Sequence, residues 1–269
     1  MSIFSELREG RLPSFPIIDC HGHAGPFHGL PIPSAWADGM LRTMDAAGIE
    51  RLVFAPDLAI GPDPEEGNRI AGRMNRDHPS RLLPYCTVGP HQPESVSRGM
   101  LEEYVASGWF VGIKLHPSLH RAPVTDPGYD IAFRYAEEYQ IPVLVHTWEP
   151  CGFSSPDLVA QAAARHPGAP VILAHSAGAH AGMARVIQLA QRHANLWVET
   201  SGSSQPWRAL ERLCEGVGVD RVLFGSDLPF LDPRPKLGAV CLADLSDDAK
   251  RAILHDNAER LFRLGDTAA

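Results

Sequence analysis

The sequence predicts an α/β protein built as a single (β/α)8 TIM barrel, and three observations support this prediction. Short β-branched segments recur at intervals of about 25 to 34 residues. Each is followed by a longer segment with helical periodicity, an alternation that is typical of a parallel sheet. There are eight such units, and the length of 269 residues is close to the roughly 250 residues of a typical barrel. We therefore expect one barrel domain over residues 1–269.

The predicted strands begin near eight residues: Ile17, Leu52, Leu82, Val111, Val143, Val171, Leu196 and Val222. Many of these segments are apolar nearly throughout, which is typical of strands that are covered on both faces. The main alternative is an open, doubly wound sheet. Its glycine-rich fingerprint is absent, because Arg221 stands where a third glycine would follow Gly216 and Gly218.

Capping residues mark helix boundaries between the strands. Ser34 is placed to cap a helix that ends at Gly48, and Ser155 with Pro156 opens a helix after the fifth strand. The segments 22–33 and 57–67 are rich in glycine and proline, so we expect loops there, on the functional face. Residues 246–264 predict one or two amphipathic helices that close the barrel, with four inward side chains: Leu254, Ala258, Leu261 and Phe262.

Composition and charge exclude several classes of function. Hydrophobic residues make up 44% of the chain and charged residues 21%, which is typical of a globular protein. A net charge of −8 disfavours binding to nucleic acid and to anionic membranes. No apolar run approaches the ~20 residues of a membrane span, and the first residues lack an apolar leader, so we expect a cytoplasmic protein. The five cysteines have no paired spacing and are expected to be free thiols. A homo-oligomer remains open.

Metal-binding side chains stand at the C-terminal ends of four predicted strands. His21 and His23 end the first strand, two residues apart and therefore on one face. His146, His175 and Asp227 end the fifth, sixth and eighth strands. The C-terminal ends of all strands surround one mouth in a barrel, so we expect these five side chains to be neighbours. Imidazole and carboxylate groups are common metal ligands, and the sequence therefore predicts a shared metal site.

The arrangement resembles the amidohydrolase superfamily, and specifically the amidohydrolase-2 branch that includes aminocarboxymuconate-semialdehyde decarboxylase-like proteins. The resemblance covers nearly the whole chain and is carried by six segments: 18–23, 112–117, 145–146, 173–176, 224–227 and 257–262. It implies one divalent ion, usually Zn²⁺, with four ligands: His21, His23, His146 and Asp227. His175 would lie outside the ligand set and orient the attacking water or a substrate oxygen.

Lys114 ends the fourth predicted strand, where binuclear members of the superfamily carry a carboxylated lysine that bridges two metals. A carboxylated Lys114 would raise the expected number of ions from one to two and would make His146 and His175 ligands of the second. An unmodified Lys114 would instead bind a substrate anion or a strand-end carboxylate, which is the interpretation that a mononuclear branch favours.

Residues near these strand ends are candidates for substrate binding. His116 shares a face with Lys114, and Trp148 follows His146, so both could line a pocket. A structural rim histidine and a tryptophan packed under a loop are the alternatives. The segment 199–203, after the seventh strand, offers hydroxyl and N–H groups that could bind an anion, or it is a plain polar loop.

The resulting hypothesis is a metal-dependent hydrolase of a small-molecule ester, lactone or amide, with Asp227 and His175 as catalytic residues that act on a metal-activated water. The alternative is a metal-dependent, non-oxidative decarboxylase or a hydratase of an unsaturated carboxylic acid. A non-catalytic binding barrel is a third hypothesis. The compact chain favours hydrolysis, because the decarboxylases of this branch tend to be longer.

Overall fold

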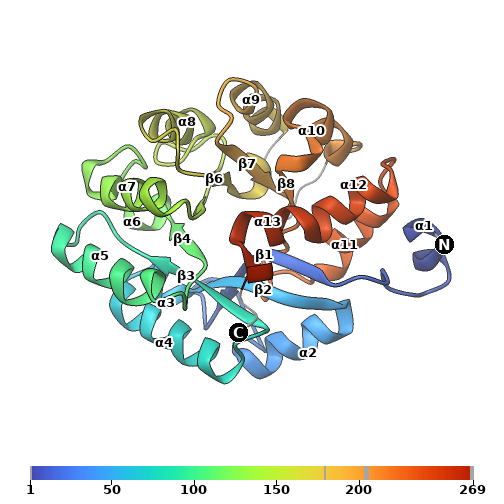
Figure 1. Cartoon of the computed structure of the whole chain (residues 1–269), viewed down its shortest axis with the longest axis horizontal. Coiled ribbons are helices and arrows are strands. Elements are labelled where there is room, and N and C mark those ends of the chain that lie inside the picture. Colours follow the sequence, from blue (N-terminus) through green and yellow to red (C-terminus); the bar gives the residue numbers. More distant parts are fainter. Residues whose placement is uncertain (1, 179, 203–205, 267–269) are drawn as a thin grey trace.

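The computed structural model describes residues 2–178, 180–202 and 206–266, and its central element is an eight-stranded parallel sheet. Consecutive strands pair in chain order, and helices surround them (Figure 1). The strands are β1 (Ile17–Ala24), β2 (Ile49–Pro56), β3 (Leu82–Thr87), β4 (Gly112–Leu115), β5 (Val143–Val145), β6 (Val171–Leu173), β7 (Leu196–Glu199) and β8 (Val222–Leu223).

Backbone hydrogen bonds between β1 and the segment after β8 bring the two ends of the sheet together. The Cys20 N–H donates to the Phe224 carbonyl at 2.9 Å, and the His23 N–H donates to the Leu228 carbonyl at 2.7 Å. The sheet is therefore a nearly closed ring, and the predicted (β/α)8 barrel is confirmed.

Six strands begin at the residue that the sequence predicts, and two differ. β2 begins at Ile49 rather than Leu52, because its pairing with β1 already starts between Ile17 and Ile49. The added residues include Glu50, which is exposed, so the apolar pattern does not reveal them. β4 begins one residue after Val111, at Gly112.

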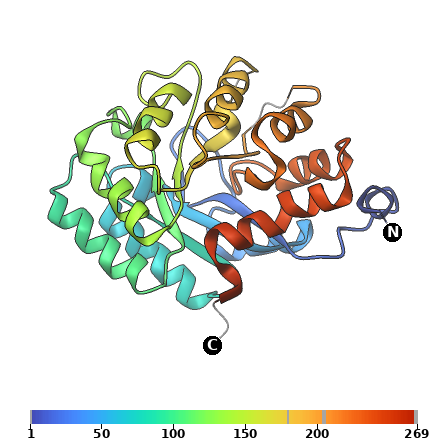
Figure 2. The same ribbon diagram turned by 45° about the horizontal axis from the view of Figure 1, so that its top comes forward.

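The helices pack around the outside of the strands (Figure 2). They are α1 (Ile3–Arg8), α2 (Ala37–Ala47), α3 (Asp57–Ile60), α4 (Pro64–Asp77), α5 (Glu94–Met100), α6 (Pro117–His120), α7 (Asp130–Tyr139), α8 (Pro156–Arg165), α9 (His180–Ala190), α10 (Ala209–Val217), α11 (Pro233–Leu242), α12 (Asp247–Arg251) and α13 (Asn257–Phe262). π-helical turns follow α5 (Leu101–Ala106) and join α12 to α13 (Ala252–Asp256). Across the described ranges, no helix has both the length and the apolar character that crossing a bilayer requires.

Two local predictions need correction. Ser34 does not cap α2: the helix begins at Ala37, after Trp36, and Ser34 lies against Gly39 in its first turn. The segment 57–67 is not all loop, because it contains α3 and the start of α4. Asp63 caps α4 by accepting a hydrogen bond from the Glu66 N–H at 3.0 Å, a local signal that outweighs the glycine and proline content.

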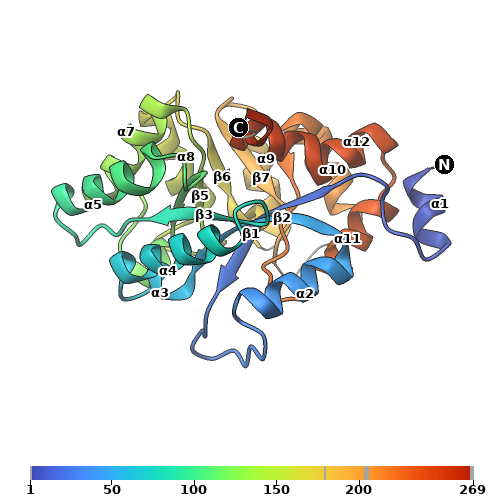
Figure 3. The ribbon, with the colours of Figure 1, turned by 60° about the horizontal axis from the view of Figure 1, so that its bottom comes forward.

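Alternate strand residues separate an inner core from an outer one. On β5, Leu144 belongs to the inner cluster, whereas Val143 and Val145 pack with the surrounding helices. The four side chains predicted to point inward are all buried, but only three of them, Ala258, Leu261 and Phe262 of α13, belong to the inner cluster. Leu254 packs in the outer cluster instead. Figure 3 shows the dark red α13 on the side opposite the loop that follows β1. The apolar core therefore fills the end of the barrel next to α13, and the other end is the mouth.

Candidate active site

Three side chains at the mouth form a cluster that could hold a metal ion. His21, His175 and Asp227 each offer one ligand atom, and these atoms lie within 4.8 Å of one another. His21 Nε2 is 3.5 Å from Asp227 Oδ1, and His175 Nδ1 is 3.4 Å from Asp227 Oδ2. Asp227 Oδ1 is buried and has no hydrogen-bond partner among the described residues. Because a buried carboxylate oxygen without a donor is costly, the arrangement fits a bound cation.

The other two predicted strand-end histidines flank this cluster. His23 Nε2 is 3.7 Å from Asp227 Oδ1, and the rings of His21 and His23 are 5.2 Å apart. His146 contacts the cluster through His175, with 3.1 Å between its Nδ1 atom and His175 Nε2. The mouth of the barrel therefore brings all five side chains together, with His175 nearer to Asp227 than the resemblance implies.

Lys114 lies beneath the cluster, inside the barrel. Its side chain is almost fully buried, and its Nζ atom is 2.7 Å from His21 Nε2. Burial lowers the pKa of Lys114 to about 8, against the opposing effect of Asp227 and Glu199. The lysine nitrogen thus lies where a metal ion would bind the same imidazole nitrogen; if the amine were carboxylated, the carbamate oxygens could serve as metal ligands.

Glu199, the last residue of β7, connects two of the cluster's histidines. Its Oε1 atom accepts hydrogen bonds from His21 Nδ1 at 3.0 Å and from the His175 backbone N–H at 2.6 Å. Burial raises the pKa of Glu199, but the interactions with His21 outweigh burial and lower this pKa to about 2. A carboxylate at Nδ1 leaves His21 Nε2 as the free ligand atom, the arrangement by which proteins orient metal-binding histidines.

The turn after β6 has an uncommon backbone conformation. His175, Ser176 and Ala177 have φ angles of 59°, 45° and 63°, and Gly178 follows at 72°. Only glycine adopts this region freely, and each other residue costs about 1 kcal/mol. Hydrogen bonds to Glu199 hold the turn: its carboxylate binds the His175 N–H, and its carbonyl accepts from Ser176 Oγ at 2.8 Å.

Glu199 belongs to the segment 199–203, whose sequence is equally typical of an anion site and of a polar loop, and its contact with both histidines was not predicted. The signal that could have found it is the one that identified the histidines, a polar residue at the end of a strand. Asp57, which follows β2, was missed in the same way, and its Oδ1 atom lies 3.2 Å from His23 Nδ1. Ser203 of that segment lies outside the described residues.

A cavity of about 350 Å³, here called the inner cavity, opens directly on the cluster. Its polar wall includes His116 and His146, whose rings stack 3.9 Å apart. Burial holds the pKa of both imidazoles well below the usual range, which favours their neutral form. Its apolar wall is formed by six residues: Phe27, Leu30, Ile60, Trp148, Phe230 and Leu231. Lys114 is not among the described residues that line it.

Trp148 packs against the turn of residues 175–178 that follows β6. A side chain at Gly178 would lie 2.5 Å from the Trp148 ring, so the indole packs on the bare glycine backbone. The ring also meets His175 edge-on, with 5.8 Å between the ring centroids. Trp148 is thus placed beside the metal-binding cluster, as the candidate role in substrate binding requires.

Solved structures with a similar fold include two kinds of decarboxylase. An uncharacterised TIM-barrel protein from Bordetella bronchiseptica is 21% identical, with 93% of this chain and 99% of that chain covered and a TM-score of 0.76. A 2,6-dihydroxybenzoate decarboxylase from Rhizobium is 18% identical, with 93% and 99% covered and a TM-score of 0.73. A 5-carboxyvanillate decarboxylase from Novosphingobium aromaticivorans, complexed with manganese and 4-hydroxy-3-methoxy-5-nitrobenzoic acid, is 16% identical, with 93% and 96% covered and a TM-score of 0.75. At these identities the similarity establishes the fold alone.

The comparison with protein families is more specific. Among curated proteins, no significant match was found. A family model described as Amidohydrolase matches residues 18–264, which include every strand of the barrel apart from the first residue of β1. The chain therefore belongs to the amidohydrolase-2 family and is an enzyme of the amidohydrolase superfamily.

Proposed function

We propose that this enzyme is a metal-dependent, non-oxidative decarboxylase of an aromatic or unsaturated carboxylic acid. The observation that carries the proposal is the inner cavity, in which aromatic walls and neutral imidazoles meet the cluster of His21, His175 and Asp227. The decarboxylases with the same fold support it. The argument for hydrolysis from chain length loses its force. This chain aligns with 99% of the 2,6-dihydroxybenzoate decarboxylase chain, so that decarboxylase has no large segment that this chain lacks.

The proposed cofactor is one divalent ion, with zinc as the ion expected from the sequence and manganese named for two relatives. Asp227, His21 and His23 would hold it together with one imidazole of the His146–His175 pair. The distance of 3.4 Å between His175 Nδ1 and Asp227 Oδ2 supports His175 as the ligand, whereas the resemblance implies His146. Separate His146→Ala and His175→Ala variants distinguish the two sets, because loss of the true ligand lowers metal affinity more strongly. A second ion would require a carboxylated Lys114.

When bound, the ion would bind and neutralise an oxygen of the substrate. The protein's own groups would do the rest. Trp148 and Phe230 would hold the substrate's planar part in the inner cavity. If His146 holds the ion, Asp227 Oδ2 and His175 Nδ1, 3.4 Å apart, would share the proton that passes to the reacting carbon. If His175 holds it, Asp227 would carry this proton without His175. The bond from that carbon to the carboxylate then breaks, its electron pair remains with the carbon, and carbon dioxide leaves. Solvent restores the proton.

Hydrolysis is the second candidate, and the charge of Asp227 favours it. Burial raises the pKa of this carboxyl, but His175 and His21 outweigh burial and hold the pKa well below its usual range. An ionised carboxylate beside a histidine can accept a proton from an attacking water. The same pair of residues would therefore serve either reaction.

The test is to assay metal-reconstituted protein against hydroxybenzoic acids, unsaturated dicarboxylic acids, lactones and esters. We expect carbon dioxide and the protonated product in equal amounts from at least one acid. Asp227→Asn should abolish this turnover, whereas Asp244→Asn, at an exposed carboxylate far from the cluster, should retain it. Turnover of lactones or esters without release of carbon dioxide would assign the enzyme to hydrolysis. No turnover of any compound would favour the binding barrel.

A further inference from the structure

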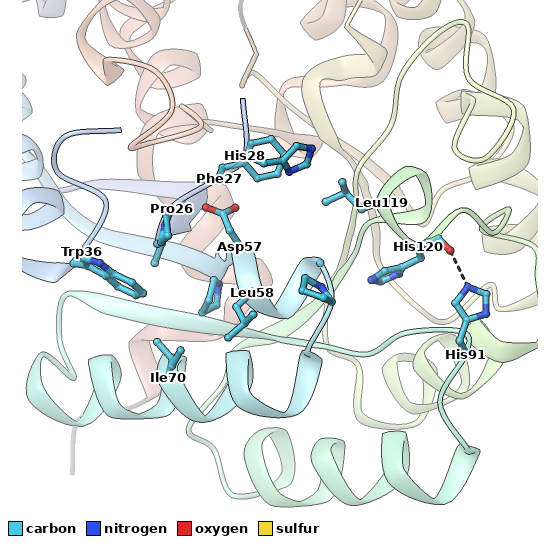
Figure 4. A pocket seen from close by; sticks show the side chains of 15 residues that line it. Pro26, Phe27, His28, Trp36, Asp57, Leu58, Ile70, His91, Leu119 and His120 are labelled. Carbon is cyan, nitrogen blue, oxygen red and sulfur yellow. Dashed lines mark hydrogen bonds between the residues drawn. The ribbon is translucent and has the colours of Figure 1, made fainter. Parts of the chain in front are cut away.

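A second and larger cavity lies beside the inner cavity, over β1 to β4. Its volume is about 850 Å³, and Figure 4 shows the side chains that line it. We call it the outer cavity. Its walls are mainly apolar and come from loops and helices after four strands, with five large members: Phe27, Trp36, Leu58, Ile70 and Leu119.

The outer cavity adjoins the proposed catalytic site. Phe27 lines both cavities. Asp57 lines the outer cavity and His23 the inner one, and the 3.2 Å contact between Asp57 Oδ1 and His23 Nδ1 forms part of the boundary. One molecule that passes Phe27 could therefore occupy both spaces.

The charge of the outer cavity restricts what it can bind. Asp57 is nine-tenths buried, and its Oδ2 atom has no hydrogen-bond donor among the described residues. None of the described residues that line the cavity is lysine or arginine. The basic groups that line it are three histidines, His28, His91 and His120, and His23 lies 3.2 Å from Asp57 Oδ1. An anionic group would face the Asp57 carboxylate, whereas an N–H or O–H group would supply the donor that Oδ2 lacks.

The sizes of the two cavities indicate an elongated substrate. Ligand cavities commonly have volumes of about 300 to 1,000 Å³ and enclose most of their ligand. The inner cavity, at about 350 Å³, has room for a one-ring acid, which leaves the outer cavity of about 850 Å³ for another group. The apolar walls favour an aryl or alkyl group there.

We propose that the outer cavity binds the distal part of the substrate, an apolar arm that is neutral or cationic and carries an N–H or O–H donor toward Asp57. This inference rests on the proposed function, because the reacting carboxylate occupies the inner cavity. It assigns reaction to the inner cavity and recognition of the arm to the outer one.

The arm's site can be tested without turnover, by calorimetric titration of the metal-reconstituted protein with 2-phenylethylamine. Ile70→Trp narrows the outer cavity, and Leu242→Trp adds the same side chain on the exposed surface of α11. We expect the amine to bind the wild type and Leu242→Trp equally and Ile70→Trp at least about tenfold more weakly. The anion 3-phenylpropanoate should show no such loss, since any binding at the metal side leaves Ile70 untouched.

Three results would overturn the proposal. The wild type could fail to bind the amine, Ile70→Trp could bind the amine as tightly as the wild type, or Ile70→Trp could lose affinity for 3-phenylpropanoate to the same extent as for the amine. Metal content and thermal melting check that Ile70→Trp is folded; if it is not, Leu58→Trp narrows the same cavity from α3. If the amine binds as expected but no acid is decarboxylated, the binding role of the outer cavity is supported and the proposed reaction is wrong. If acids are decarboxylated, a hydroxybenzoate with an aminoethyl arm should react with a higher kcat/KM than its parent.

Discussion

The two halves of the barrel mouth are built on different principles. In the half formed by β6, β7 and β8, one carboxylate, Glu199, binds the ring of His21 and the backbone of His175. In the half formed by β2, β3 and β4, the corresponding strand-end carboxylate, Asp57, has an oxygen without a donor and faces a large apolar cavity. The hydrogen bonds of Glu199 fix the positions of the two histidines, and in the same half only Asp227 Oδ1, on the proposed ion's side, is described as lacking a partner. The unsatisfied oxygen of Asp57 instead borders a cavity that can take a ligand. Under the proposed function, the first half would serve the chemistry and the second the recognition of the substrate.

The largest expected effect on metal content and activity comes from removing His21 and His175, the two histidines that Glu199 binds. The variant His21→Ala/His175→Ala takes two of three clustered donors from the metal-binding half. We expect it to lose its bound ion and to lower kcat by about a thousandfold or more, since the ion and the proton-transfer pair disappear together. Elemental analysis and steady-state assays measure both quantities.

The matched control is His193→Ala, which removes a partly exposed histidine in the turn before β7, away from the mouth. It should keep the wild-type metal content of about one ion per chain. Two ions in the wild type would identify Lys114 as a bridging ligand. Retention of the ion by the double variant would show that the metal site lies elsewhere.

A smaller effect is expected from Glu199→Gln, which preserves the size of the side chain but removes the charge at His21 Nδ1. Carboxylates that orient metal-binding histidines contribute about 10- to 100-fold to metal affinity. We expect the metal dissociation constant to rise by this factor, with saturating metal restoring most of the activity. Competition with a chromophoric chelator measures the constant. Glu215→Gln, at an exposed site on α10, should leave it unchanged, and equal affinity in both variants would exclude the positioning role.

The recognition half should make stability depend on pH through His120. Burial, with a further contribution from His91, lowers the pKa of His120 from 6.5 to about 4. Between these values the unfolded chain binds a proton that the folded protein excludes, so stability is lost as the pH falls. From pH 7 to pH 5 this amounts to about 2 kcal/mol. Urea unfolding should show that His120→Gln, which can keep a hydrogen bond to Tyr129, loses less stability over this interval than wild type.

His193→Gln serves as the control for that experiment and should lose as much stability as the wild type between pH 7 and pH 5. If His120→Gln shows the same pH dependence as the wild type, the imidazole is accessible to protons in the folded protein. The packing of the recognition half would then be looser than the buried position of His120 indicates.

Much of the fold could be predicted from sequence because strand burial leaves a strong local signal. Apolar runs such as residues 143–145 mark strands that are buried on both faces, and six strands begin where such runs begin. The mouth follows from the same reasoning, since polar residues that end these runs must meet there. His21 and Asp227 are 206 positions apart in the chain, yet they are neighbours for this reason alone.

What could not be predicted depends on contacts between distant segments. The left-handed turn at His175 has glycine only at its fourth position, so the local sequence does not predict it. The turn is held by hydrogen bonds that His175 and Ser176 donate to Glu199. The outer cavity exists because Trp36, which precedes α2, and Ile70 of α4 are brought to the wall of the same space. No periodic pattern in the sequence predicts a cavity of this kind.

The seam between β1 and the segment after β8 also has a consequence for the order of folding. His21 and His23 lie on one side of this seam and Asp227 on the other, and the Asp227 N–H donates to the His21 carbonyl at 3.0 Å. The proposed ligands would therefore be assembled only when the first strand meets the last, a contact of long sequence separation. An ion bound there would connect the two ends of the sheet. It would bind late in folding and would slow the separation of β1 from the segment after β8.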